Sequence, residues 1–173
     1  MKKLLLLITV LFFGISTANA QIEKASEGTI YEVMFTPNLD AAGQFALQDS
    51  HIVVRDFNGD GTATRYKLRV DFESMDGGED TMTLGAMYGK EKHHEGTARL
   101  GTYTGWEGGL LFDDPGSSDS TLDISAGVFV GANYYIANNL YIGTEISFNA
   151  EIGDDSFGVE PGVKGMLTLG WKM

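Results

Sequence analysis

The chain has 173 residues, no cysteine and a net charge of −12, with 24 acidic residues against 12 lysines and arginines. This length suits one domain with its own core, and a chain without cysteine has no disulfide framework, thiolate metal site or cysteine nucleophile. Because the acidic charge repels the phosphates of nucleic acid, we expect no nucleic-acid partner.

The first 20 residues have the pattern of a secretory signal peptide. Two lysines follow Met1, residues 4–15 are apolar, and Ala18-Asn19-Ala20 supplies the small-x-small pattern that precedes cleavage. The apolar stretch is shorter than the roughly 20 residues that a membrane-spanning helix needs. We therefore expect residues 1–20 to be a cleaved signal peptide and residues 21–173 to form the folded domain of an exported protein.

Beyond the signal, the composition and the patterning favour strands. Glycine is abundant (23 residues), proline is scarce (3), and aromatic and β-branched residues are frequent. The clearest strands alternate strictly between apolar and polar residues, a period of two, at Tyr66–Glu73 and Leu140–Ile152. In chain order the sequence predicts eight strands: Gly28–Pro37, Phe45–Phe57, Tyr66–Glu73, Thr81–Lys90, Thr97–Phe112, Leu122–Ile136, Leu140–Ile152 and Val163–Met173.

The connections between these strands alternate between short turns and longer acidic stretches. The turns are Asn58–Gly61, Lys92–Gly96 and Ala137–Asn139, and the longer connections are Asn38–Gln44, Ser74–Asp80, Asp113–Ser120 and Gly153–Gly162. Outer-membrane barrels have short periplasmic turns and longer extracellular loops, and eight strands of roughly 9–11 residues fit this chain whereas a sixteen-stranded porin does not. An open sheet edge in lipid would leave amide groups without partners. The sequence therefore predicts an all-β fold, a single eight-stranded antiparallel up-and-down transmembrane β-barrel.

Alternation alone does not tell which face of the barrel is outside. A soluble periplasmic, lipocalin-like barrel would turn Leu140, Ile142, Ile146 and Phe148 inward around a small apolar ligand, whereas a membrane barrel would turn them towards lipid. Charges of both signs and many glycines on the polar face, and aromatic residues near the strand ends, favour the membrane barrel. In that case a lumen charge network is expected from Glu32, Arg65, Lys67, Arg69, Arg99, Glu107, Glu145 and Lys164.

Two hairpins carry a resemblance to a known family. The segment Gly127–Glu145 resembles the strand, turn, strand hairpin of small outer-membrane β-barrel proteins of the OmpA and OmpX types, and Gly89–Gly105 is similar to the central hairpin of versions common in Bacteroidota. The resemblance implies the cell outer membrane as location, outer-membrane lipid as surroundings and the barrel-assembly machinery as a partner during biogenesis. The family often ends on an aromatic residue that this machinery recognises, whereas this chain ends on Met173.

Two short segments contain residues that bind metals in other proteins. Asp56–Gly61 matches the opening of an EF-hand calcium loop, but the twelfth position is Lys67 where the loop requires a bidentate Glu, so a glycine-containing hairpin turn is favoured. His93-His94, flanked by Glu91 and Glu95, could bind a transition metal only in a loop, because neighbouring residues of a strand point to opposite faces. We expect neither a metal nor another cofactor.

No catalytic motif was found in the sequence. Asp49, Ser50 and His51 are neighbours on a predicted strand, where alternation of faces keeps them from converging as a catalytic set. We therefore expect that the protein is not an enzyme. We expect a structural or surface-interaction protein with acidic loops and an unidentified loop partner. Because eight strands enclose a space about wide enough for side chains alone, we expect the lumen to be plugged rather than open like a porin.

Overall fold

The computed structural model describes residues 24–39, 45–73, 80–116, 119–153 and 157–172. Within these ranges, the side chains of residues 38, 39, 45–49, 73 and 157–165 lie outside the description. All structural statements below concern the described part.

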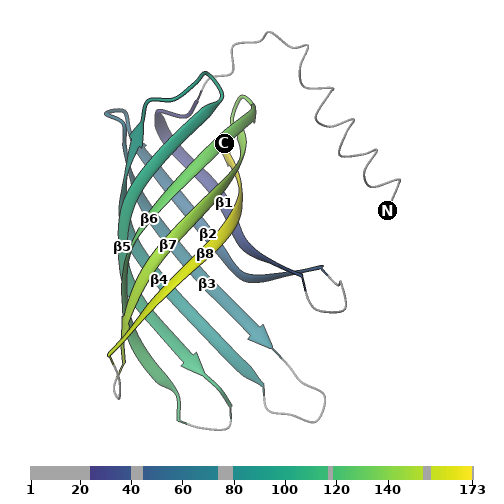
Figure 1. Cartoon of the computed structure of the whole chain (residues 1–173), viewed down its shortest axis with the longest axis vertical. Coiled ribbons are helices and arrows are strands. Elements are labelled where there is room, and N and C mark those ends of the chain that lie inside the picture. Colours follow the sequence, from purple (N-terminus) through teal and green to yellow (C-terminus); the bar gives the residue numbers. More distant parts are fainter. Residues whose placement is uncertain (1–23, 40–44, 74–79, 117–118, 154–156, 173) are drawn as a thin grey trace.

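Eight antiparallel strands form one closed barrel, with each strand paired to its neighbours in the chain and β1 paired to β8 (Figure 1). The predicted fold class is thereby confirmed. The strands are β1 (Glu27–Leu39), β2 (Phe45–Asn58), β3 (Thr62–Glu73), β4 (Thr81–His94), β5 (Leu100–Asp114), β6 (Thr121–Ala137), β7 (Leu140–Ile152) and β8 (Phe157–Lys172).

Most strands differ from the prediction at one or both ends by one or two residues, and four ends differ by more. β3 begins at Thr62 rather than Tyr66. β4 continues to His94 instead of ending at Lys90, and β5 begins at Leu100 rather than Thr97. β8 begins at Phe157 rather than Val163, and its register with β7 shifts near Pro161, where Ser147 pairs with Lys164 but Asn149 pairs with Glu160. Proline has no amide hydrogen for the ladder, so strands accommodate it at such irregularities, and a sequence pattern of period two misses them.

The short turns lie at one end of the barrel, together with the start of β1 and the end of β8 (top of Figure 1). Between β2 and β3, Gly59 and Gly61 have φ values of 82° and 80°, which glycine adopts without steric cost. Asp60 between them accepts hydrogen bonds from the Thr62 hydroxyl and from the Thr62 amide (2.9 Å), which lower the pKa of its carboxyl. The Asp56–Gly61 segment is thus the end of a strand and a hairpin turn.

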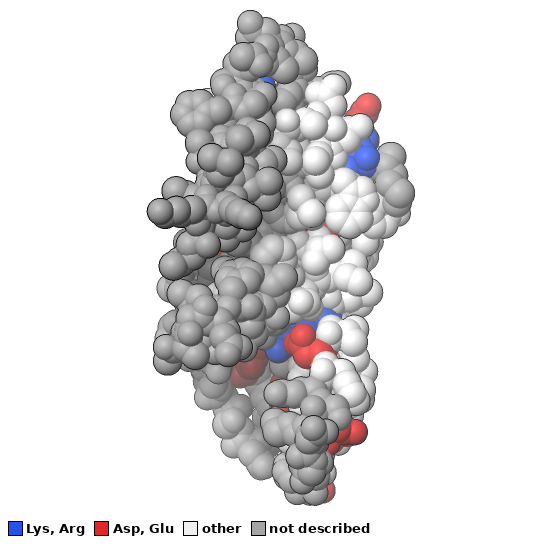
Figure 2. All heavy atoms as spheres, turned by 90° about the vertical axis from the view of Figure 1, so that its right-hand side faces the viewer, with Lys and Arg blue, Asp and Glu red and all other residues white. Residues whose placement is uncertain are grey.

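Apolar side chains cover the outside of the barrel wall. On β7, Ile142, Ile146 and Phe148 are 44%, 37% and 46% exposed, and Leu68 and Val70 on β3 are 51% and 64% exposed. The alternative in which the apolar face of β7 surrounds an internal apolar ligand is therefore wrong. In Figure 2, the described middle of the wall is largely uncharged, and charged atoms lie towards the two ends.

Three aromatic residues form a row, here called the aromatic belt, across neighbouring strands on the outside of the wall. Tyr66 on β3, Tyr88 on β4 and Trp106 on β5 are exposed on the outside, with ring centroids 5.7 Å apart for the two tyrosines and 6.2 Å apart for Tyr88 and Trp106. Such belts occupy the interface between hydrocarbon and water in membrane proteins. No described residue belongs to a helix long and apolar enough to cross a membrane.

Candidate functional site in the barrel interior

Seven charged side chains meet inside the barrel, and we call them the central ion-pair cluster. Each is at most 2% exposed, and they come from β1, β2, β3, β4, β5 and β7. The alternation of faces places them inward, because each occupies the same side of its strand as other buried residues. The members are the cations Arg55, Arg65 and Lys67 and the carboxylates Glu32, Glu91, Glu107 and Glu145.

Arg55 on β2 contacts three of the four carboxylates. Its Nη1 lies 2.8 Å from Glu32 Oε2, its Nε 2.9 Å from Glu91 Oε1 and its Nη2 3.6 Å from Glu145 Oε2. The guanidinium also lies over the ring of Tyr103, 4.4 Å from its centroid. The planar fork of an arginine suits several carboxylates at once, so this one residue joins β1, β4 and β7 across the interior.

Arg65 on β3 forms the second branching point. Its Nη1 and Nη2 bind the two carboxylate oxygens of Glu145 at 2.6 and 2.9 Å, and its Nε lies 3.5 Å from Glu107 Oε2. The ammonium of Lys67, two residues along the strand, donates a hydrogen bond to Glu107. Each cation of the central ion-pair cluster therefore has a carboxylate partner in the low-dielectric interior, where an unpaired charge would be costly.

Two tyrosines complete the cluster with hydrogen bonds. The Tyr103 hydroxyl donates to Glu145 Oε2 at 3.0 Å, and the Tyr141 hydroxyl donates to Glu32. Their rings need space that glycine leaves on the neighbouring strand: a Cβ on Gly131 would stand 2.2 Å from the ring of Tyr103, and one on Gly170 2.2 Å from the ring of Tyr141. Glycine on the inward face thus lets large side chains fill the barrel.

The structure brings five of the eight predicted network residues into the cluster, namely Glu32, Arg65, Lys67, Glu107 and Glu145. Arg69 lies farther along β3 towards the longer loops, where its Nε pairs with Asp71, and the two side chains are 23% and 33% exposed. Arg99 was predicted within a strand but lies in the connection before β5. Its backbone carbonyl accepts a hydrogen bond from the Tyr135 amide. Lys164 pairs with Ser147 through the backbone, but its side chain lies outside the described residues.

Sequence reasoning missed Arg55, Glu91, Tyr103 and Tyr141. On β2 the inward positions are His51, Val53, Arg55 and Phe57, a mixture that gives no polar face. Glu91 was expected beyond the end of a strand. Strict counting by two from His51, together with a strand that continues to His94, would have placed both residues inside.

The two adjacent histidines point to opposite faces because β4 includes both. His93 faces the interior, where its Nε2 lies 3.0 Å from Glu91 Oε2 and its ring packs against Phe57 and Tyr103. His94 is exposed on the outside, with Nε2 3.0 Å from the Thr104 hydroxyl. The pair therefore cannot share one metal ion, and no group of three or more metal-binding side chains occurs among the described residues.

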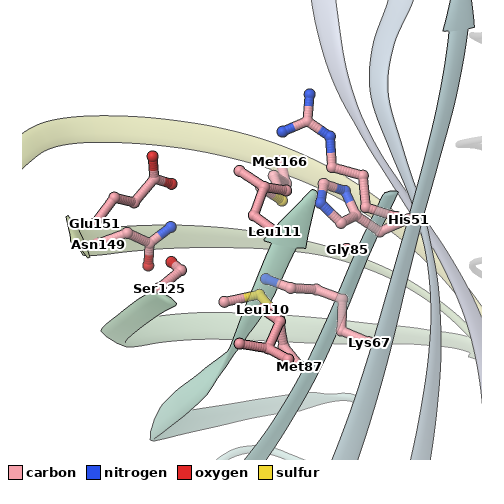
Figure 3. A pocket seen from close by; sticks show the side chains of 11 residues that line it. His51, Lys67, Gly85, Met87, Leu110, Leu111, Ser125, Asn149, Glu151 and Met166 are labelled. Carbon is pink, nitrogen blue, oxygen red and sulfur yellow. The ribbon is translucent and has the colours of Figure 1, made fainter. Parts of the chain in front are cut away.

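The third histidine, His51, lines a small cavity on the loop side of the central ion-pair cluster. The cavity has a volume of about 40 Å³, and Figure 3 shows His51 and Lys67 on one side of it and Ser125, Asn149 and Glu151 on the other. The neighbour of His51 in the suspected catalytic trio, Ser50, is exposed on the outside of β2, and the side chain of Asp49 lies outside the described residues. His51 and Ser50 therefore do not converge.

Comparison with known proteins identifies the fold. No family model matches the chain. No curated protein matches it. Among solved structures, Neisserial surface protein A is similar over 82% of this chain and 92% of its own, with a TM-score of 0.54 and 14% identity. This likeness shows the fold alone, that of a small outer-membrane β-barrel.

Two further structures match less closely. The match to the N-terminal β-barrel domain of Pseudomonas aeruginosa OprF covers 84% of this chain and 96% of the OprF chain, with a TM-score of 0.46 and 14% identity. The match to Ail, the attachment invasion locus protein of Yersinia pestis, covers 83% of this chain and 96% of the Ail chain, with a TM-score of 0.46 and 12% identity.

Proposed function

We propose that this chain is an integral outer-membrane β-barrel protein with a structural or surface-interaction role, whose lumen is closed by the central ion-pair cluster. The main support for the proposal is which side chains lie on each side of the barrel wall. Apolar side chains lie on the outside, and buried charges that form ion pairs lie on the inside. In a soluble barrel this apolar wall would be exposed to water, which is unfavourable. In a membrane the same wall contacts lipid, which is equally apolar.

The closed lumen follows from the size of the barrel and from what fills it. Eight strands enclose an interior about wide enough for side chains. Arg55 and Arg65 lie across that interior, each bound to carboxylates from other strands and stacked on an aromatic ring, Tyr103 or Phe129. A hydrated ion would have to displace these pairs, which would leave buried charges without their partners at a high cost in free energy.

The proposed role is not enzymatic, and it leaves the loops as the surface for partners. At the end away from the short turns, the longer connections and the strand ends beside them are acidic, as in Asp113 and Asp114 at the end of β5 and Asp119 beyond it. In the proposed orientation they face the outside of the cell, because outer-membrane barrels keep their short turns in the periplasm. Residues 1–20 would direct export and be removed, and the assembly machinery would insert the remaining chain.

Cell fractionation combined with gel mobility tests this proposal. The protein should pellet with the outer membrane, and unboiled samples should migrate differently from boiled ones because the folded barrel resists detergent. Its intact mass should correspond to a chain that begins at Gln21. Recovery in the soluble periplasmic fraction with no heat-dependent shift would contradict the membrane assignment, and a mass that includes residues 1–20 would contradict cleavage.

A further inference from the structure

A basic patch lies on the outside of the barrel at the end that carries the short turns. Lys90 and Lys92 both point outward from β4 and are exposed. Across the sheet, Lys90 pairs with Thr64 on β3 and Trp106 on β5, and Lys92 pairs with Thr62 and Thr104 on the same strands. The patch thus places two ammonium groups beside one exposed aromatic ring.

These lysines border an open groove on the outer wall. The groove has a volume of about 630 Å³ and runs from the turn at Asp60 past the two lysines to Trp106 and Val128. Val128 is 57% exposed and Trp106 49% exposed, so the far end of the groove is apolar. One end therefore offers positive charge, and the other offers an apolar surface at the level of the aromatic belt.

Among the acidic groups near the lysines, Glu91 is bound by an arginine. The hydrogen bonds from Thr62 and, to a smaller extent, the charge of Lys90 lower the pKa of the exposed Asp60 carboxyl, although Asp60 and Lys90 form no ion pair. Asp60 accepts two hydrogen bonds from Thr62, and Glu91 also borders the groove but is buried and paired with Arg55. Asp56, exposed on β2, accepts a hydrogen bond from Thr29 at 3.3 Å, and Thr64 separates it from Lys90 in the sheet. No ion pair involves Lys90 or Lys92 within the described residues, although the whole chain carries an excess of acidic groups.

We propose that the groove along Lys90, Lys92 and Trp106 binds one anionic phospholipid of the periplasmic leaflet. The two ammonium groups hold the headgroup phosphate, and an acyl chain lies along Trp106 and Val128. This inference rests on the proposed membrane orientation, which puts the short turns in the periplasm. Lysine side chains extend to the headgroup region, aromatic rings mark its inner edge, and each lysine near an anionic membrane surface contributes about 1 kcal/mol.

Native mass spectrometry of the purified barrel in detergent tests the site. The probes are phosphatidylglycerol and phosphatidylcholine with identical acyl chains. The wild type should retain one phosphatidylglycerol, and the variant Lys90→Gln/Lys92→Gln should bind it roughly 30-fold more weakly, which corresponds to the loss of two such contributions. Phosphatidylcholine should not distinguish the two proteins.

The matched control is Lys24→Gln/Lys172→Gln. It removes two lysines from the same end of the barrel, at positions that do not line the groove. The control should bind phosphatidylglycerol like the wild type. Equal weakening in both double variants would show general attraction between charges and would overturn the site. So would competition by millimolar inorganic phosphate, since that would make free phosphate the ligand.

A second measurement leaves both lysines in place and so does not depend on the folding of the variant. With Trp171→Phe, Trp106 is the one remaining tryptophan of the chain. Its fluorescence should be quenched about twofold more in vesicles whose phosphatidylglycerol carries brominated acyl chains than in vesicles where phosphatidylcholine carries them. Equal quenching would overturn the inference. If the protein still pellets with the outer membrane and shifts on heating, the proposed function survives that failure.

Discussion

The guanidinium of Arg65 binds both carboxylate oxygens of Glu145, at 2.6 and 2.9 Å, and so bridges β3 and β7 through the barrel interior. Both side chains are fully buried. These strands are not neighbours in the closed sheet, so no backbone hydrogen bonds connect them. The ion pair therefore links opposite parts of the wall, and its loss should reduce the stability of the whole barrel.

Reversal of the charge at Glu145 should destabilise the folded barrel. In Glu145→Lys the new ammonium would face Arg65 and Arg55, and the four cations would share the three remaining carboxylates of the cluster. At least one buried charge would then lack its own partner, which costs roughly 3–5 kcal/mol. Urea unfolding in lipid vesicles, followed by the heat-dependent gel shift, measures the change in the free energy of unfolding.

The matched control for that change is Glu151→Lys. Glu151 lies on the same strand and the same face, but it is only half-buried and lines the cavity nearer the loops. Water screens a charge there, so the same reversal should cost about 1 kcal/mol or less. Equal unfolding midpoints for the wild type and Glu145→Lys would show that the interior charges are solvated.

A charge on the outer wall should be costly in proportion to its depth. Ile146 is the middle residue of β7, and Ile152 ends the same strand on the same outward face. Ile146→Arg should destabilise the barrel in vesicles by roughly 2–4 kcal/mol, and Ile152→Arg by about 0–1 kcal/mol, because arginine near the interface reaches water. Similar costs at the two positions would mean that β7 does not span the hydrocarbon layer.

The orientation of the barrel can be tested by thiol labelling, since the chain has no cysteine of its own. On whole cells, a membrane-impermeant thiol reagent should label Asp119→Cys in a long connection. It should label Asn138→Cys in the β6–β7 turn only after the outer membrane is permeabilised, and it should leave Ile142→Cys and Leu68→Cys shielded by lipid. Labelling of Asn138→Cys on intact cells would invert the orientation, and equal reactivity at all four positions would contradict the topology.

The sequence predicts the strands well where one face meets lipid and the other meets the packed interior. Tyr66–Glu73 and Leu140–Ile152 alternate strictly, and both ranges lie within strands of the structure. Strand ends are harder to predict from the sequence. The hydrogen bonds between strands continue beyond the residues in which apolar and polar side chains alternate clearly. On β4 the ladder continues to His94 opposite Thr102, although Lys92, His93 and His94 have the composition of a turn.

The partners within the cluster could not be predicted from the sequence. Alternation tells that Arg65 and Glu145 face inward, but which inward residues meet depends on the register and tilt of strands that are far apart in the chain. The bond from Arg55 to Glu91 spans 36 residues, and the bond from Arg65 to Glu145 spans 80. Arg99 shows the reverse error, because a shift of the β5 start by three residues removes it from the strand.

The central claim, that the ion pairs close the lumen, is tested most directly by conductance in planar lipid bilayers. The wild-type barrel should insert without steady current, because Arg55, Arg65 and their carboxylates occupy the interior. Insertion is checked independently by the heat-dependent gel shift of protein recovered from the same vesicles. Baseline current after proven insertion is the result that the account predicts, and large, stable, porin-like current steps from the wild-type protein would contradict it.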